Sequence, residues 1–159
     1  MQFCSLAGAI IILACGFELS RRLNKRYSER LSSAEAYLAL LRYIRSQIDC
    51  YALPIGDILE RADKDLLIRC GWRMEDSPRS LEELLEKSES VDFGANPLLR
   101  EFCLDFGNNY RDEQLRRCDH YINALSDISD ALARELPSKK KLNSTLCISG
   151  ALAVVILLI

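Results

Sequence analysis

Two uncharged stretches frame this chain, and they constrain its fold more than any other feature of the sequence. Residues 3–17 are apolar apart from Ser5, and residues 142–159 carry no charged side chain. Every Asp, Glu, Lys and Arg lies from Glu18 to Lys141. A helix needs roughly 17 to 25 predominantly apolar residues to cross the hydrocarbon core of a bilayer. The sequence therefore predicts a transmembrane helix within residues 1–19 and another within residues 142–159.

Basic residues flank both stretches on the side of the central chain. Arg21, Arg22, Lys25 and Arg26 follow the first stretch, and three consecutive lysines, residues 139–141, precede the second. Such cationic flanks stay on the cytoplasmic side of a membrane. We therefore expect residues 20–141 to form one cytoplasmic domain, with both ends of the chain on the opposite side.

Three other interpretations of the first stretch are less favoured. A cleaved secretory signal normally begins with positive charge, and only Met1 and Gln2 precede this apolar run. Residues 12–15 loosely resemble a bacterial lipid-attachment box ending at Cys15, but this interpretation also lacks the basic start. A buried helix of a soluble protein would not explain why a similar stretch stands at the other end of the sequence.

The central residues carry two long helical patterns. Apolar side chains recur at intervals of three and four residues from Ala34, with no glycine or proline between Ala34 and Pro54. This pattern predicts one long helix continuing from the first stretch. This first stripe consists of Ala34, Tyr37, Leu38, Leu41, Ile44, Ile48 and Tyr51. The second stripe consists of Leu115, Cys118, Ile122, Leu125, Leu132 and Leu136, with Ser129 as its polar member. Such spacing favours side-by-side packing of two antiparallel helices.

Shorter helices are predicted between these two arms. One fits residues 55–68 after Pro54, and residues 71–79 read as a loop. Ser80 and Glu83 form a capping box that predicts a helix over residues 81–88. Another helix begins at Pro97 with Asn96 as its cap and with Leu98, Leu99, Phe102 and Phe106 facing inward, before residues 107–109 turn the chain. The expected fold is all-α: an antiparallel bundle of about five helices with a transmembrane helix at each end.

Charge excludes some classes of partner. Residues 27–138 contain 22 acidic and 14 basic side chains, a net of −8, which disfavours nucleic acid. The acids concentrate in residues 82–92, which form either a docking face for a basic partner or, as we favour, the solvated side of a helix.

No catalytic or metal-binding pattern stands out. The seven cysteines include no C-x-x-C pair, so neither a zinc site nor a disulfide framework is indicated, and most should be buried hydrophobic residues. His120 is the single histidine and is expected at the surface rather than as a general base. We find no phosphate-binding glycine loop and no nucleophile motif. The chain is therefore expected to be neither an enzyme nor a cofactor-binding protein.

A family resemblance extends this interpretation. The run of residues 102–114 resembles the signature of the stage III sporulation protein AB family. That signature has two Leu-Gly pairs, then an aspartate, then a glutamine. Phe106 and Gly107 fall on the second Leu-Gly pair, and Gln114 falls on the glutamine. Ile48, Tyr51 and Pro54 resemble the stretch where the family's long first helix meets a turn. Cys103 replaces the usual first glycine, and Tyr110 replaces the usual aspartate. The missing carboxylate puts in doubt any family interaction built on it.

The resemblance implies a role in endospore formation. It implies a component of the mother-cell membrane facing the forespore, in a secretion-like channel that joins the two cells. It also implies a cytoplasmic domain similar to the inner-membrane platform proteins of type II secretion and type IV pilus machines. Expected partners are the channel ATPase, stage III sporulation protein AA, and the other channel membrane proteins.

The alternative is a regulatory adaptor that binds a partner transiently. A platform protein should also self-associate through its membrane segments, and an adaptor need not. The small residues that should then face other helices are Gly8, Ala9, Ala14, Gly16, Gly150, Ala151 and Ala153.

Overall fold

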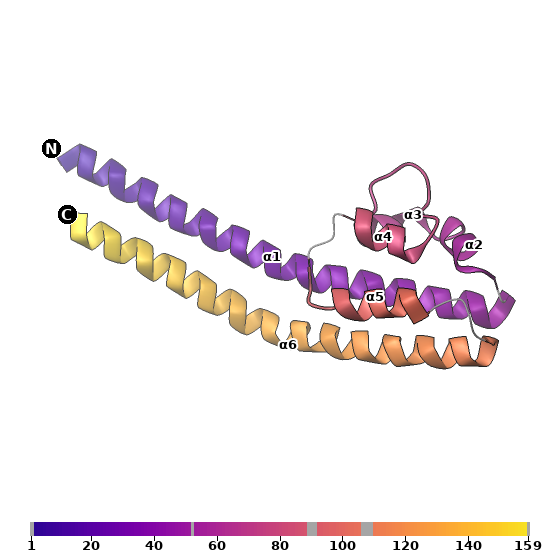
Figure 1. Cartoon of the computed structure of the whole chain (residues 1–159). Helices are drawn as coiled ribbons and strands as arrows, with labels where there is room; N and C mark the ends of the chain where they lie inside the picture. The colour runs from indigo at the N-terminus through magenta and orange to yellow at the C-terminus, as the bar shows by residue number, and fades with distance from the viewer. Residues whose placement is uncertain (1, 52, 89–91, 106–109, 159) are drawn as a thin grey trace. The chain divides into compact units, whose positions relative to one another are not determined.

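The computed structural model describes residues 2–51, 53–88, 92–105 and 110–158, without the side chains of residues 2–7, 9, 105, 157 and 158. Within these ranges the chain is all-α and contains no strand, which confirms the predicted fold class (Figure 1). The helices are α1 (Gln2–Tyr51), α2 (Ile55–Glu60), α3 (Lys64–Arg69), α4 (Leu81–Lys87), α5 (Asn96–Asp105) and α6 (Arg111–Leu158). They form two compact units: a central unit of residues 30–132, and a terminal unit of residues 1–29 and 133–159.

The core of the central unit follows the predicted stripes. The first stripe is buried on α1: at most 2% of the surface is exposed at Ala34, Leu41, Ile44 and Ile48. The second stripe is buried on α6 at Cys118, Ile122 and Leu125, and it is half-buried at Leu115 and Leu132. Arg45 pairs with Asp119, and Asp49 pairs with Arg111, so the two helices run antiparallel in this unit, as expected.

Tyr51 does not belong to the buried face, and its predicted inward position was wrong. It is the last residue of α1, where the buried face of the helix ends, and it is 67% exposed.

The helix predicted over residues 55–68 is divided into α2 and α3. Asp63 interrupts it, because its backbone is extended and its carboxylate accepts a hydrogen bond from the backbone N–H of Asp65 at 3.0 Å. This is an N-cap, which begins a new helix rather than continuing the previous one. Residues 71–79 form the predicted loop, and Gly71 takes a positive φ of 95° at its start.

The capping box at the start of α4 forms in a modified way. The Ser80 hydroxyl accepts from the Glu83 N–H at 3.1 Å, as predicted. The Glu83 carboxylate accepts from the N–H of Arg79 at 2.8 Å rather than from that of Ser80. It also accepts from Lys87 Nζ at 2.7 Å, and these two hydrogen bonds hold the pKa of Glu83 below its ordinary value. The cap therefore fixes both the start of α4 and the end of the preceding loop.

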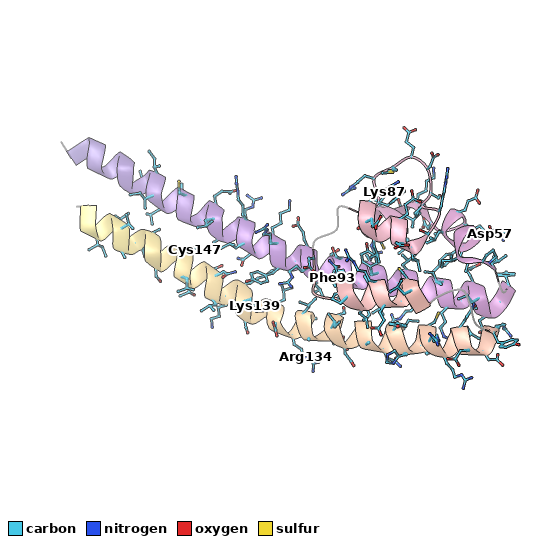
Figure 2. All side chains as sticks on the ribbon, in the orientation of Figure 1. Asp57, Lys87, Phe93, Arg134, Lys139 and Cys147 are labelled. Atoms are coloured by element: carbon cyan, nitrogen blue, oxygen red, sulfur yellow. The ribbon has the colours of Figure 1, made fainter. Side chains whose placement is uncertain are left out.

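Aromatic side chains join α5 and the loop before it to the long helices. Phe102 of α5 is buried and meets the Tyr121 ring of α6 edge to face at 5.2 Å between centroids. Phe93, labelled in Figure 2, is buried against Tyr37 of α1 at 5.6 Å, and the Tyr37 hydroxyl donates to the Ser88 hydroxyl at 3.1 Å. Leu99 is buried and Leu98 half-buried, as predicted, whereas Phe106 lies outside the described residues.

In the terminal unit, α1 and α6 pack closely at Gly16. A Cβ placed on Gly16 would lie 2.8 Å from the Cβ of Ala151 and 3.2 Å from the carbonyl oxygen of Cys147, so only glycine fits. This contact confirms that Gly16 and Ala151 face a helix, and that helix is the other arm of the same chain. Gly8 and Gly150 meet no atom of this kind within 4 Å.

The remaining small residues do not extend this contact within the chain. Ala14 and Ala153 are exposed, and the side chain of Ala9 lies outside the described residues.

Among the residues that the structure places, no helix carries a stretch long and apolar enough to cross a membrane. The transmembrane helices predicted within residues 1–19 and 142–159 are therefore not supported by the described part of the chain.

Candidate functional site

The residues of the two sequence motifs meet at one end of the central unit. Ile48 and Tyr51 belong to the last turn of α1, Pro54 stands just before α2, and Gln114 lies in the first turn of α6. Phe106 and Gly107 lie outside the described residues. We call this end, where α1 stops and α6 starts, the motif junction.

Arg111 connects the two helices at the motif junction. Its Nη2 donates to the carbonyl oxygen of Asp49 and, at 2.8 Å, to the Asp49 carboxylate, while its Nε donates to the carbonyl oxygen of Ile48 at 3.4 Å. The last four carbonyls of a helix have no partner within that helix, and a cation there also interacts favourably with the helix dipole. Arg111 of α6 therefore caps the C-terminus of α1.

A second ion pair supports this contact further along the helices. Arg45 of α1 donates from Nε and Nη2 to the two carboxylate oxygens of Asp119 on α6, the latter at 3.1 Å. A two-pronged guanidinium–carboxylate pair fixes orientation as well as charge. The hydrogen bond from Arg45 holds the pKa of Asp119 below its ordinary value, and the same pair raises the pKa of Arg45. The two helices are thus fixed in register near their junction.

Aromatic side chains stand exposed on either side of this contact. Tyr51 follows Asp49 by two residues and is 67% exposed, and Tyr110 directly precedes Arg111 and is 92% exposed. Pro54 is also exposed, whereas Ile48 is buried and Gln114 half-buried. Exposed aromatics on a rigid support are typical of protein-binding surfaces. Ile48 therefore has a packing role, and Tyr51, Tyr110 and Pro54 are available to a partner.

A hollow between α4 and α5 offers a second surface. It has a volume of about 180 Å³. Its lining residues are Glu82, Leu85, Glu86, Arg100, Cys103 and Leu104. Leu104 is 83% exposed, and Glu82 and Glu86 are exposed on α4, while Glu83 is committed to its cap. Part of the acidic segment of residues 82–92 is therefore an accessible rim beside an apolar side chain, and Glu89 lies outside the described residues.

A larger hollow lies beside the loop before α4. It has a volume of about 540 Å³, and charged side chains of both signs line it, among them Glu60, Lys64, Glu75 and Arg79. Trp72 holds this loop by donating from Nε1 to the Asp76 carbonyl oxygen at 2.7 Å. Apart from Gly56 and Pro78 its lining residues are polar or charged, whereas small-molecule pockets are lined predominantly by apolar and aromatic side chains.

Three of the cysteines, Cys70, Cys103 and Cys118, show little nucleophilic character. Burial raises the pKa of Cys70 to about 12 and that of Cys103 and Cys118 to about 11. A thiol reacts as its thiolate, so these three groups are unreactive at neutral pH. Of the cysteines whose side chains the structure describes, Cys70 and Cys118 are buried, Cys103 and Cys147 are half-buried, and Cys15 and Cys50 are exposed, so the prediction that most are buried was wrong. His120 is exposed beside Tyr121, as predicted.

Within the described residues, no group of three or more His, Cys, Asp or Glu side chains is placed to hold a metal ion. The arrangement at the motif junction instead offers a contact surface held by ion pairs.

Sequence reasoning missed the role of Arg111 and of its partner Asp49. The sequence indicates this contact only indirectly. It places an arginine soon after the predicted turn and a carboxylate near the end of the other long helix. Only the antiparallel pairing brings them together.

Comparison with known proteins identifies a family. The family model described as stage III sporulation protein AB matches residues 5–159, which is nearly the whole chain. No curated protein and no solved structure matches the chain.

Proposed function

The chain belongs to the stage III sporulation protein AB family, and we propose that it is a non-enzymatic component of the secretion-like channel between mother cell and forespore. Family membership makes it a sporulation-related protein. In this proposal the central unit contacts the channel ATPase, stage III sporulation protein AA, and couples it to the membrane components.

The motif junction is the observation that carries this proposal. The motif residues that the structure describes, Ile48, Tyr51, Pro54 and Gln114, lie near the point where Arg111 caps α1. Exposed Tyr51 and Tyr110 flank that cap. A contact surface that transmits force must itself be rigid. The Arg45–Asp119 pair and the Arg111 cap join the two longest helices at this point.

Charge also favours a protein partner here. The central unit carries thirteen Lys and Arg against twenty Asp and Glu, a net of −7. An acidic surface suits a partner with a basic face and accelerates their encounter. The exposed Glu82 and Glu86 beside Leu104 supply one such acidic contact.

Membrane association is part of the same proposal. Large apolar side chains of the terminal unit are exposed on both helices, including Ile11 and Phe17 of α1 and Leu146 and Ile156 of α6. Exposed apolar surface of this extent indicates contact with lipid or with other membrane proteins. Gly8 and Gly150 have open space around them, which suits close packing against a second copy or another channel component.

The test is affinity purification of the tagged full chain from detergent-solubilised membranes of sporulating cells, with identification of retained proteins by mass spectrometry. We expect the ATPase and channel membrane proteins to be retained, and the ATPase to be lost from Tyr51→Ala/Tyr110→Ala. The matched control is Ile68→Ala/Met74→Ala, which also removes two exposed large side chains from the central unit and should retain the ATPase.

Two outcomes contradict the proposal. Retention of the ATPase by the tyrosine variant would remove the motif junction as the contact. Recovery of no channel component from a monomeric wild-type chain would refute the platform function and favour the transient adaptor.

A further inference from the structure

Charge is divided sharply between the two units. The terminal unit carries eight Lys and Arg against three Glu, a net of +5, whereas the central unit has a net of −7. Seven of the eight terminal cations lie within residues 21–26 and 139–141, which we call the basic collar. The overall charge of −2 conceals this strongly cationic segment.

The two halves of the basic collar lie at one level of the helix pair. Ser20 donates its hydroxyl to that of Ser144 at 3.1 Å, which marks one side of the collar. Lys139, labelled in Figure 2, holds its Nζ 5.7 Å from the centre of the Tyr27 ring, which marks the other side. The cations between these contacts therefore form a single band, about 8 Å tall at 1.5 Å per residue.

Most of the collar is accessible to a ligand. Arg21, Arg26 and Lys141 are exposed, and the side chains of Arg22 and Lys25 are 78% and 76% exposed. The three Glu of the unit pair with collar cations one helical turn away: Glu18 with Arg22, Glu29 with Lys25 and Glu135 with Lys139. The other four collar cations, Arg21, Arg26, Lys140 and Lys141, do not take part in these three pairs.

Next to the collar, the helix pair is apolar outside and polar inside. Ile10, Phe17, Leu142 and Leu146 are each more than half exposed, while Ser20 is only 5% exposed. Asn24 donates to the Ser144 hydroxyl at 3.1 Å between the helices. This arrangement reverses that of a water-soluble helix pair and is typical of helices surrounded by lipid.

We propose that the basic collar binds the phosphates of anionic phospholipids at the membrane surface. The height of the collar matches the headgroup layer, which is about 5 to 8 Å thick on each side of the hydrocarbon core. Apolar surface on one side of the collar would contact the acyl chains, and the acidic central unit would be repelled by the same headgroups. The inference rests on the proposed membrane association and adds the class of lipid.

The test compares vesicles of two compositions. The full chain is diluted from detergent into neutral phosphatidylcholine vesicles or into vesicles containing about one third phosphatidylglycerol, and floated protein is measured over a range of lipid concentrations. Each Lys or Arg near an anionic surface contributes about a fivefold gain in partitioning. We therefore expect anionic vesicles to be favoured at least a hundredfold, less so at high salt.

Two quadruple variants separate the collar from net charge. In the collar variant, Arg21→Gln/Arg26→Gln/Lys140→Gln/Lys141→Gln, partitioning into anionic vesicles should fall several hundredfold. Its partitioning into neutral vesicles should change little. The control, Arg42→Gln/Arg61→Gln/Lys64→Gln/Arg69→Gln, removes four exposed cations from the central unit and should lower partitioning far less than the collar variant does.

Each contrary result has a distinct meaning. Equal partitioning into both vesicle types would overturn the anionic preference and leave membrane association standing. An anionic preference that survives the collar variant would overturn the assignment to these residues. Failure to float with either vesicle would overturn the proposed membrane association together with this inference.

Discussion

Replacing Arg111 with alanine tests the physical basis of the motif junction. The guanidinium makes three hydrogen bonds to the end of α1, two of them to backbone carbonyls that the helix cannot satisfy itself. Arg111→Ala would leave these carbonyls to water and remove the cation from the negative end of the helix dipole. We expect the central unit to become less stable without a change of fold.

The size of the effect follows from the exposure of the site. Hydrogen bonds to charged groups contribute about 1.5 to 3 kcal/mol when sheltered, and a cation at a helix C-terminus adds about 0.3 to 1 kcal/mol. The Arg111 and Asp49 side chains are both 49% exposed, which weakens the ion pair towards the lower values typical of surfaces. We therefore expect a loss of about 1 to 2 kcal/mol, or about 5 to 15 °C in Tm for a unit of this size.

Trp72 provides the assay, because it is the single tryptophan of the chain and is only 4% exposed. Its fluorescence reports unfolding of the central unit in the detergent-solubilised full chain. Arg111→Lys should recover at most half of the loss, since one ammonium group cannot bond both carbonyls. Arg116→Ala is the control, because that side chain is 76% exposed and pairs with Glu113 on its own helix. Equal Tm losses for Arg111→Ala and Arg116→Ala would refute the reasoning.

Three further predictions concern other contacts. The pKa of Asp119 is lowered in the folded chain, so its ionised form stabilises the fold above the unfolded pKa of about 3.9. This stability is lost as the pH falls through the folded pKa. Asp119→Asn should therefore lower Tm at pH 7 and lower it progressively less below about pH 4. Gly16→Val should separate the terminal helices and lower the yield of a disulfide engineered across them, whereas Gly8→Val, with open space around it, should not. Cys50 should be alkylated by iodoacetamide at neutral pH at least tenfold faster than Cys70, whose thiol is buried, as peptide mass spectrometry would measure.

Much of the fold could be predicted because the long helices carry their pattern in local spacing. Leu41 and Leu125 are buried where the three-four periodicity places them, and Ser80 begins α4 as its capping pattern indicates. The break before α3 could also have been predicted, since Asp63 is a good N-cap residue. However, Leu59, Ala62 and Leu66 keep helical spacing across Asp63, which favoured one continuous helix.

Other features depend on tertiary contacts that no local pattern contains. Arg111 becomes a helix cap only because α6 starts where α1 ends. Tyr51 keeps the spacing of a buried residue, yet it stands at the last position of its helix and is 67% exposed. The close approach at Gly16 likewise requires the register of the terminal helices, which a list of small residues does not specify.

We propose that the motif junction faces the channel ATPase, and photocrosslinking is the most direct test of this contact. A photoreactive phenylalanine analogue replaces Tyr110 in the full chain, and crosslinking is carried out in sporulating cells. The same analogue at Met74, which is 51% exposed elsewhere in the central unit, is the control. The account predicts a crosslink to the ATPase from position 110 and none from position 74. A chain that crosslinks equally at both positions, or only at position 74, would contradict it.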